Sequence, residues 1–457
     1  MSQSGFAGDE INSLRVSYRT RVLYGLFLLL ISFNSLRADQ NQPDVEEVEG
    51  QPLGANVKRL ISALDYLGSP LSESLIQNLT AACDQRDAKT IQQLLDSEVL
   101  CVVSLNPEVR TKVARGPARA LLQQAGFTPF IIKVINHSTV TRQLQISSPQ
   151  AGAVYSGAAL NSLKRQAQTE LNRNENIKNA TDRFLEVELF QASPMTVKLS
   201  GLQVEYAIAL VYCHESGKRE ATLGFDVGAG TQDIGFRGEV PVLFDVQPAV
   251  PVKLSIKDFD GKPSAARLEF RDQQERVFPL QAKRLAPDFF FQPQIYRLDG
   301  DTVLLPSGVL QMEYSRGPEY QRLTKKVTVS AEAPQTIEVQ LKRWVNPREF
   351  GFYSGDHHIH AAGCAHYDNP TKGVSPRDMF NQVKGEGLNV GCVLTWGPCF
   401  DVQRQFFAST ADRVSEPLTV LKYDLEISGF GSAALGHVCL LNLQDQTYPG
   451  TFGTTKG

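Results

Sequence analysis

The spacing of apolar residues changes at about residue 126, and this change constrains the fold more than any other feature of the chain. Before it, Val57, Leu60, Ile61, Leu64 and Leu67 follow the repeat of an amphipathic helix. After it come short segments rich in β-branched and aromatic residues, as in strands. A chain of 457 residues is also too long for one hydrophobic core. We therefore predict a multidomain α+β protein of roughly three domains.

Residues 55–126 are predicted to form a small helical region. Gly68-Ser69-Pro70 separates the first two helices, with Ser69 as the N-cap and Pro70 in the first turn of the second helix. A third helix is expected around residues 91–95, and the apolar run at 99–103 is short enough to be a strand. We assign no chemistry to this region.

Two β regions follow. The first, residues 127–249, is predicted to contain strands at 129–135, 140–146, 184–190 and 204–213. In the second, residues 250–346, two alternating segments flank an Asp260-Gly261 turn, which favours an antiparallel sandwich. Its segment KLSIKDFDGKPSAARLEF resembles the carboxypeptidase-regulatory-like modules found beside many exported enzymes. Such modules position or bind rather than catalyse.

Residues 1–38 have the organisation of a secretory signal peptide. Arg15, Arg19 and Arg21 precede an apolar run over residues 22–33, and Ala38 is a small residue at a cleavage position. The run is shorter than the ~20 residues that a membrane helix needs. The acidic residues 39–54 read as a linker. We expect an exported protein of the periplasm, cell envelope or extracellular space, held at the membrane only if the signal is uncleaved.

Charge and cysteine content exclude several classes of protein. The chain has 46 basic and 49 acidic residues, a balance that predicts no nucleic-acid partner. Gly228-Ala229-Gly230 lacks the Gly-Lys-Ser of a phosphate-binding loop. Seven cysteines without a Cys-x-x-Cys pair do not indicate a disulfide framework. The expected partner is a small-molecule or envelope substrate.

Histidines gather in one part of the chain. Five of the seven lie between positions 357 and 437, and three of them belong to the segment Gly355-Asp356-His357-His358-Ile359-His360. On a strand, His358 and His360 point to the same face, where two imidazoles can bind one divalent cation. His357 points the other way, so we leave it out. His214 is predicted to be a surface or capping residue.

Three segments in order resemble the polymerase-and-histidinol-phosphatase (PHP) superfamily, in its CehA/McbA-like metallohydrolase branch. They are Gly355-Asp356-His357-His358-Ile359-His360, then GLNVGCVLT at 387–395 after an expected helix at 376–386, then YDLEISG at 423–429 with the following Gly436-His437. The resemblance implies a distorted barrel of strands and helices that holds two or three divalent ions, commonly zinc, manganese or iron.

The resemblance also assigns roles. His358 and His360 would bind the first ion, Glu426 would bridge, and His437 would serve a neighbouring ion. A bridged water would attack a phosphoester, amide or carbamate while the ions neutralise the developing charge. Asp356 would orient an imidazole from outside the ligand set, as a second catalytic residue beside Glu426. His366 is kept as a reserve ligand.

The chain departs from this family in two places and in length. Where relatives carry Thr-Asp-His, it has Thr395-Trp396-Gly397, and an apparent insertion at 430–435 separates Glu426 from His437. A complete βα barrel takes ~250 residues, whereas residues 347–457 can supply only part of one. We therefore expect a partial barrel, and a truncated chain that binds metal weakly and is inactive as it stands.

Two alternatives remain open from the sequence. In the first alternative, the chain is a non-catalytic exported binding or scaffold protein with a vestigial metal module. The absence of the Asp-His pair favours this alternative. Alternatively, the histidines form a structural zinc site, which a carboxylate ligand and the lack of ordered cysteine pairs argue against. The number of metal ions stays open in every case.

Overall fold

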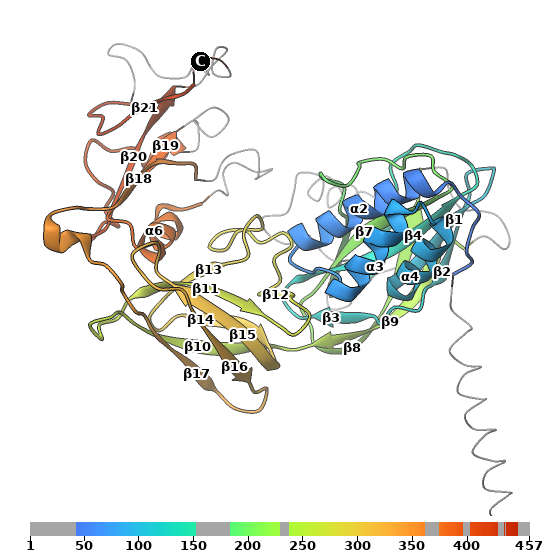
Figure 1. The fold of residues 1–457 in the computed structure, drawn as a ribbon, viewed down its shortest axis with the longest axis horizontal. Helices are drawn as coiled ribbons and strands as arrows, with labels where there is room; N and C mark the ends of the chain where they lie inside the picture. The colour runs from blue at the N-terminus through green and yellow to red at the C-terminus, as the bar shows by residue number, and fades with distance from the viewer. Residues whose placement is uncertain are drawn as a thin grey trace, which may run out of the picture.

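The computed structural model describes residues 43–151, 183–228, 237–361, 374–395, 403–427, 434 and 436–446. These residues form an N-terminal unit of helices and strands, a β-sandwich and a C-terminal sheet, in chain order (Figure 1). The protein is thus a β-rich multidomain protein. The predicted signal peptide lies outside the described residues, as do His366 and Trp396. In the described part of the chain, no helix has the length and apolar character needed to cross a bilayer.

Three helices open the N-terminal unit: α2 (Gly50–Tyr66), α3 (Glu73–Asp84) and α4 (Ala88–Leu95). Helix α2 therefore begins within the predicted linker. The predicted N-cap of α3 is wrong, because the Ser72 hydroxyl, not that of Ser69, accepts the hydrogen bond from Leu75 N–H. Ser69 instead lies in the turn that closes the C-terminal end of α2, where its N–H donates to Leu64 O at 2.9 Å.

The strands of this unit build two facing sheets, one in the order β2-β1-β4-β7-β6 and one in the order β3-β9-β8-β5. Their bounds are β1 Val99–Leu105, β2 Thr111–Arg115, β3 Leu121–Gln123, β4 Phe127–Asn136, β5 Gln145–Ser147, β6 Leu185–Leu189, β7 Val204–Cys213, β8 Gly217–Asp226 and β9 Glu239–Gln247. Alternate residues of β4 face opposite sides: Ile131 packs in the core beneath the helices and Ile132 in the core between the sheets. The unit has three layers, with the helices over β1, β4 and β7 (Figure 1).

The predicted boundary at residue 126 falls inside this unit. Strand β1, from the region predicted as helical, pairs in parallel with β4, from the region predicted as β-rich. The strand predicted at 140–146 is observed only as β5. The reason is local, because the side chain of Asn136 bonds to both the N–H and the C=O of Val140 and folds this segment into a turn.

The β-sandwich has two sheets, one in the order β14-β10-β17 and one containing β12-β11-β15-β16 with β13 beside β11. Its strands are β10 Ala249–Lys257, β11 Ala265–Arg271, β12 Val277–Phe278, β13 Ile295–Leu298, β14 Thr302–Pro306, β15 Gly308–Ser315, β16 Leu323–Val329 and β17 Gln335–Gln340. Most pairs are antiparallel as predicted, but β10 and β17 pair in parallel. This differs from the predicted antiparallel sandwich. After β16 in the second sheet, the chain crosses to the first sheet, where β17 lies beside β10 and runs in the same direction.

The loop between β12 and β13 reaches into three hydrophobic cores. Leu280 belongs to the core of the sandwich, Ala282 to the core beneath the N-terminal helices, and Phe289 to the core of the C-terminal sheet. Hydrogen bonds reinforce the contacts, since Gln281 donates to Tyr66 O at 2.9 Å and Gln382 donates to Pro287 O at 2.8 Å. The three parts are therefore packed against one another rather than strung on free linkers.

Candidate metal centre

The C-terminal sheet has the order β18-β19-β20-β21 (Figure 1). The first three strands, β18 Gly355–Ile359, β19 Val390–Thr395 and β20 Val420–Ile427, are parallel, and β21 Val438–Leu440 runs antiparallel to β20. Helix α6, Pro376–Gly385, precedes β19 and is capped by Ser375. The described residues form an open sheet.

The two faces of this sheet differ in chemistry. On one face, Phe380 of α6 packs in a core with Val393 and Tyr423, and Ile359 lies against it. Because side chains alternate along a strand, Asp424 and Glu426 of β20 point to the other face. That face carries the polar groups of the sheet.

Three histidines and one carboxylate meet on the polar face. Glu426 Oε2 lies 3.1 Å from Nε2 of His358 and 3.0 Å from Nε2 of His360. The two imidazole nitrogens lie 3.1 Å apart. His437 Nδ1 contacts the other carboxylate oxygen, Oε1. The structure therefore brings together all four residues that the sequence predicted as metal ligands.

The spacing of the donor atoms fits a divalent cation. Zinc binds imidazole nitrogen and carboxylate oxygen at about 2.0–2.2 Å, which separates adjacent ligand atoms by about 2.8–3.1 Å at right angles and by about 3.3–3.6 Å at tetrahedral angles. The separations among His358 Nε2, His360 Nε2 and Glu426 Oε2 are 3.0–3.1 Å. Two histidines with one carboxylate is also a ligand set that suits iron. Glu426, His358 and His437 each offer a ligand atom within 4.8 Å of the others.

Burial supports the same assignment. The Glu426 side chain is 0% exposed, whereas those of His358 and His437 are 36% and 38% exposed. Within the described part of the chain, Glu426 Oε1 accepts no hydrogen bond of acceptable geometry, although His437 Nδ1 lies against it. A buried carboxylate oxygen without a hydrogen bond is costly. A cation between the imidazoles and the carboxylate would satisfy it.

The environment keeps one imidazole available for metal. Burial lowers the pKa of His360, the Glu426 carboxylate raises it, and the neighbouring His358 and His437 rings lower it, with a net decrease from 6.5. A lower pKa means that the His360 ring is neutral at pH 7. Neutral imidazole is the form that binds metal.

The other residues singled out from the sequence have different positions. The Asp356 carboxylate accepts a hydrogen bond from the backbone N–H of His358 at 3.0 Å, so it constrains the strand rather than an imidazole ring. His357 is exposed, and His214 lies at the surface 3.9 Å from Glu215.

The sequence did not reveal a second polar cluster on this face, formed by Lys422 and Asp424. Lys422 Nζ lies 3.0 Å from Asp424 Oδ1, with the two side chains 8% and 0% exposed. Gln446 donates to Thr395 Oγ1 at 2.6 Å. The alternation of Lys422, Asp424 and Glu426 along one strand was the available signal. This signal is weak, because charged side chains are rarely buried in a parallel strand.

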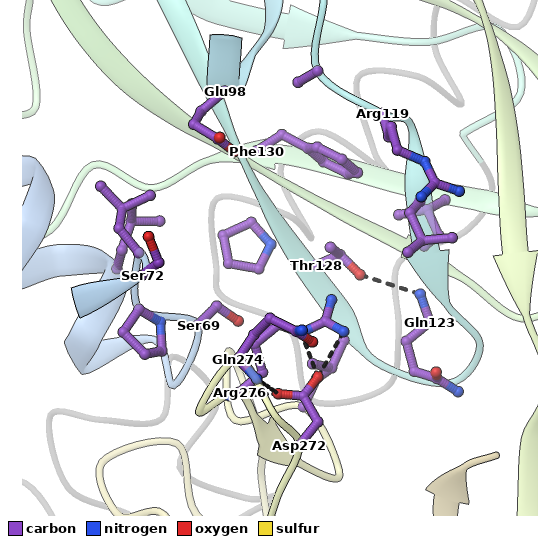
Figure 2. Close-up of a pocket in the computed structure, with 18 of the residues that line it drawn as sticks. Ser69, Ser72, Glu98, Arg119, Gln123, Thr128, Phe130, Asp272, Gln274 and Arg276 are labelled. Carbon is purple, nitrogen blue, oxygen red and sulfur yellow. Dashed lines mark hydrogen bonds and ion pairs between the residues drawn. The ribbon is translucent and has the colours of Figure 1, made fainter. Parts of the chain in front are cut away.

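A large cavity lies elsewhere, between the N-terminal unit and the β-sandwich. Its volume is about 1040 Å³, and its lining includes Phe130 and apolar leucines together with Arg119, Gln123 and Glu98. Figure 2 shows Asp272 bonded to Arg276 on the sandwich side and Thr128 bonded to Gln123 on the other. None of the predicted metal ligands lines this cavity.

Comparisons with known proteins give little further guidance. No family model and no curated protein matches the chain. Among solved structures, it is similar to the major pilin subunit BcpA of Bacillus cereus, with 11% identity, 50% of this chain and 68% of that chain covered, and a TM-score of 0.19. The Bacillus anthracis TIE protein matches with 10% identity, coverage of 67% and 57%, and a TM-score of 0.14. The McoA multicopper oxidase of Aquifex aeolicus matches with 8% identity, coverage of 58% and 69%, and a TM-score of 0.15.

Proposed function

We propose that this protein is an exported, metal-dependent hydrolase whose metal ligands are His358, His360, Glu426 and His437. The observation that carries the proposal is the meeting of three imidazoles at one buried carboxylate. The ligands come from β18 and the residue after it, from β20 and from the residue before β21, segments far apart in the chain. The resemblance of these segments to the PHP superfamily agrees with the same assignment.

A divalent cation held here would lower the pKa of a bound water and polarise the scissile group of a phosphoester, amide or carbamate. Glu426 presents Oε2 to His358 and His360 and Oε1 to His437, so this carboxylate can serve one ion or bridge two. The partly exposed imidazoles leave the outer side of the site open to a substrate. The backbone of β18 is held by Asp356 through His358 N–H.

Metal analysis of the purified full chain tests the proposal. Wild-type protein equilibrated with zinc, manganese or iron should bind the metal even if weakly, and His358→Ala and His360→Ala should each lose most of that binding. His357→Ala is the matched control, because His357 lies on the same strand, is exposed and is not among the ligands. Equal metal content in wild type and in the three variants would rule the site out.

Activity is tested with chromogenic phosphoesters, carboxyl esters, amides and carbamates. Any hydrolysis by wild type that disappears with a chelator, returns with added metal and is missing in His358→Ala would assign the reaction. If wild type and His358→Ala hydrolyse the substrate at the same rate in the presence of added metal, the hydrolysis takes place at another site.

Export is tested by fusing residues 1–54 to an enzyme that is active only outside the cytoplasm. The apolar run after Arg15, Arg19 and Arg21 predicts an active fusion. Replacing Leu28 and Leu29 of that run by Arg should abolish the activity, and an unchanged signal would contradict export by this segment.

A binding function is the second candidate, and the cavity between the N-terminal unit and the β-sandwich favours it. A volume of about 1040 Å³ with apolar and hydrogen-bonding walls suits an organic ligand. Thermal-shift screening with envelope saccharides and peptides tests this. A ligand that raises the Tm of wild type and of His358→Ala equally, but not of an Arg119→Glu variant, would support binding in the cavity.

A further inference from the structure

Strand β21 needs an anchor beyond its own pairing. It has three residues and pairs with β20 through Leu425, Glu426 and Ile427. A two-stranded ladder this short is marginal by itself. His437 immediately precedes the strand, so any slip of β21 would withdraw its imidazole from Glu426.

Asp424 supplies that anchor. Its side chain is fully buried, and it accepts backbone hydrogen bonds from the second and third residues after β21: from Asn442 N–H to Oδ2 at 3.0 Å and from Leu443 N–H to Oδ1 at 3.1 Å. Asn442 has a φ of +56°, a conformation that turns consecutive N–H groups toward one acceptor. The carboxylate thus fixes the chain just beyond β21.

Lys422 completes the arrangement. Its Nζ donates to Asp424 Oδ1 at 3.0 Å, to Tyr423 O at 3.1 Å and to Leu443 O at 3.3 Å, and it lies 4.6 Å from the centre of the Phe407 ring. All three ammonium protons therefore have acceptors. The buried carboxylate is neutralised, and the lysine also bonds to the segment that follows β21.

Asp424 and Glu426 are two residues apart on the same strand and point to the same face of the sheet. The link from one to the other runs through β21, because Asp424 fixes Asn442 and Leu443, and the strand between them and His437 pairs with β20. An apolar residue at 424 would fill the same volume, but it would offer no acceptor to these N–H groups.

We propose that Asp424 is a positioning residue of the metal centre, which holds β21 in register so that His437 meets Glu426. This inference rests on the proposed function for its metal-binding consequences, but the placement of His437 can be measured without metal. In this proposal Asp424 is not a metal ligand and acts only through the position of β21.

Zinc affinity of the full chain, measured by competition with a chromophoric chelator, tests the proposal. Asp424→Asn keeps the shape of the side chain and should weaken zinc binding by about 10- to 100-fold, the usual cost of losing a group that orients a ligand. His437→Ala should weaken binding by a similar factor. Glu319→Gln is the matched control, because Glu319 is a buried carboxylate paired with Arg343 in the sandwich, and its zinc affinity should equal that of wild type.

The double variant Asp424→Asn/His437→Ala separates positioning from general loosening of the fold. If Asp424 acts through His437, the double variant binds zinc as weakly as His437→Ala alone. If the two losses multiply, Asp424 merely stabilises the module and the proposal is overturned. Wild-type affinity in Asp424→Asn would overturn it too.

Imidazole NMR signals of the metal-free protein provide the second measurement. The His437 signals, assigned with His437→Ala, should shift in Asp424→Asn, while those of exposed His357 stay in place. Unchanged His437 signals overturn the proposal. If wild type binds no zinc but the signals shift, the proposed function fails and the positioning role stands.

Discussion

Lys133 on β4 and Asp96, in the turn after α4, form an ion pair of 2.8 Å with side chains 0% and 2% exposed. Tyr206 donates to the other carboxylate oxygen at 2.9 Å, and Lys133 also donates to Asp44 O at 2.8 Å. The pair joins the helical layer to the first sheet. Its charges are tolerated in the interior because each has several partners.

Breaking this pair should destabilise the N-terminal unit strongly. Asp96→Ala leaves the lysine charge buried without its counterion, and we expect a loss of about 3–5 kcal/mol in the free energy of unfolding. The double variant Asp96→Leu/Lys133→Met should recover most of that loss, because it removes both charges. Urea unfolding measures both effects. A cost below about 1 kcal/mol for the single variant would mean that water reaches the pair.

Phe289→Ala should uncouple the C-terminal sheet from the sandwich. Phe289 is 7% exposed and packs in the core with Phe380 and Tyr423, so its removal should cost about 3–5 kcal/mol. Hydrogen exchange should accelerate in β19 and β20 but not in β4. Phe291→Ala is the control: Phe291 stacks on Phe289 but is 48% exposed, and its loss should cost less than half as much. Equal costs would contradict the assignment of Phe289 as the connecting residue.

Zinc affinity should fall as the pH is lowered from about 7 to 5, because protons compete with metal for imidazole nitrogen. The pKa of His360 is lowered from 6.5, mainly by burial, so its ring takes up a proton only at lower pH than an unperturbed imidazole would. Protonation of His360 should therefore weaken zinc binding by wild type at the acidic end of this range, and His360→Ala, which binds zinc more weakly at every pH, should show a shallower dependence there. Calorimetry at several pH values measures this, and equal slopes in the two proteins would contradict the assignment of His360 as a ligand.

Alanine substitutions at Gly317 and Gly351 distinguish the cost of backbone strain from the cost of a steric clash. Gly317 has a φ of +72°, and a Cβ there would lie 1.8 Å from Glu386 O beyond the end of α6. Gly351 has a φ of +80° with nothing within 4 Å of a Cβ. Gly351→Ala should cost only the left-handed backbone strain, about 1–2 kcal/mol, and Gly317→Ala clearly more. Thermal unfolding compares them, and equal Tm values would mean that α6 moves freely away from residue 317.

The site was more predictable from the sequence than the fold around it. His358 and His360 are two residues apart on a strand, so their shared face follows from local geometry. Glu426 and His437 came from a resemblance of motifs, and no spacing rule could have placed them beside His358.

The features that the sequence did not predict depend on long-range pairing. The pairing of β1 with β4 and of β10 with β17, and the anchoring of Asn442 by Asp424, each depend on which distant segments meet. A periodic pattern shows that a segment is a strand, but it does not show which strand lies beside it.

The proposed metal ligands also bear on how this protein should be handled. His358 stands on β18, an outer strand of the sheet that the described residues form, while Glu426 stands on β20, 68 residues further along the chain. An ion shared by the two would close that loop across the intervening strand, much as a disulfide does. Chelating buffers would then free an outer strand to pair with other molecules, so purification in EDTA should promote aggregation.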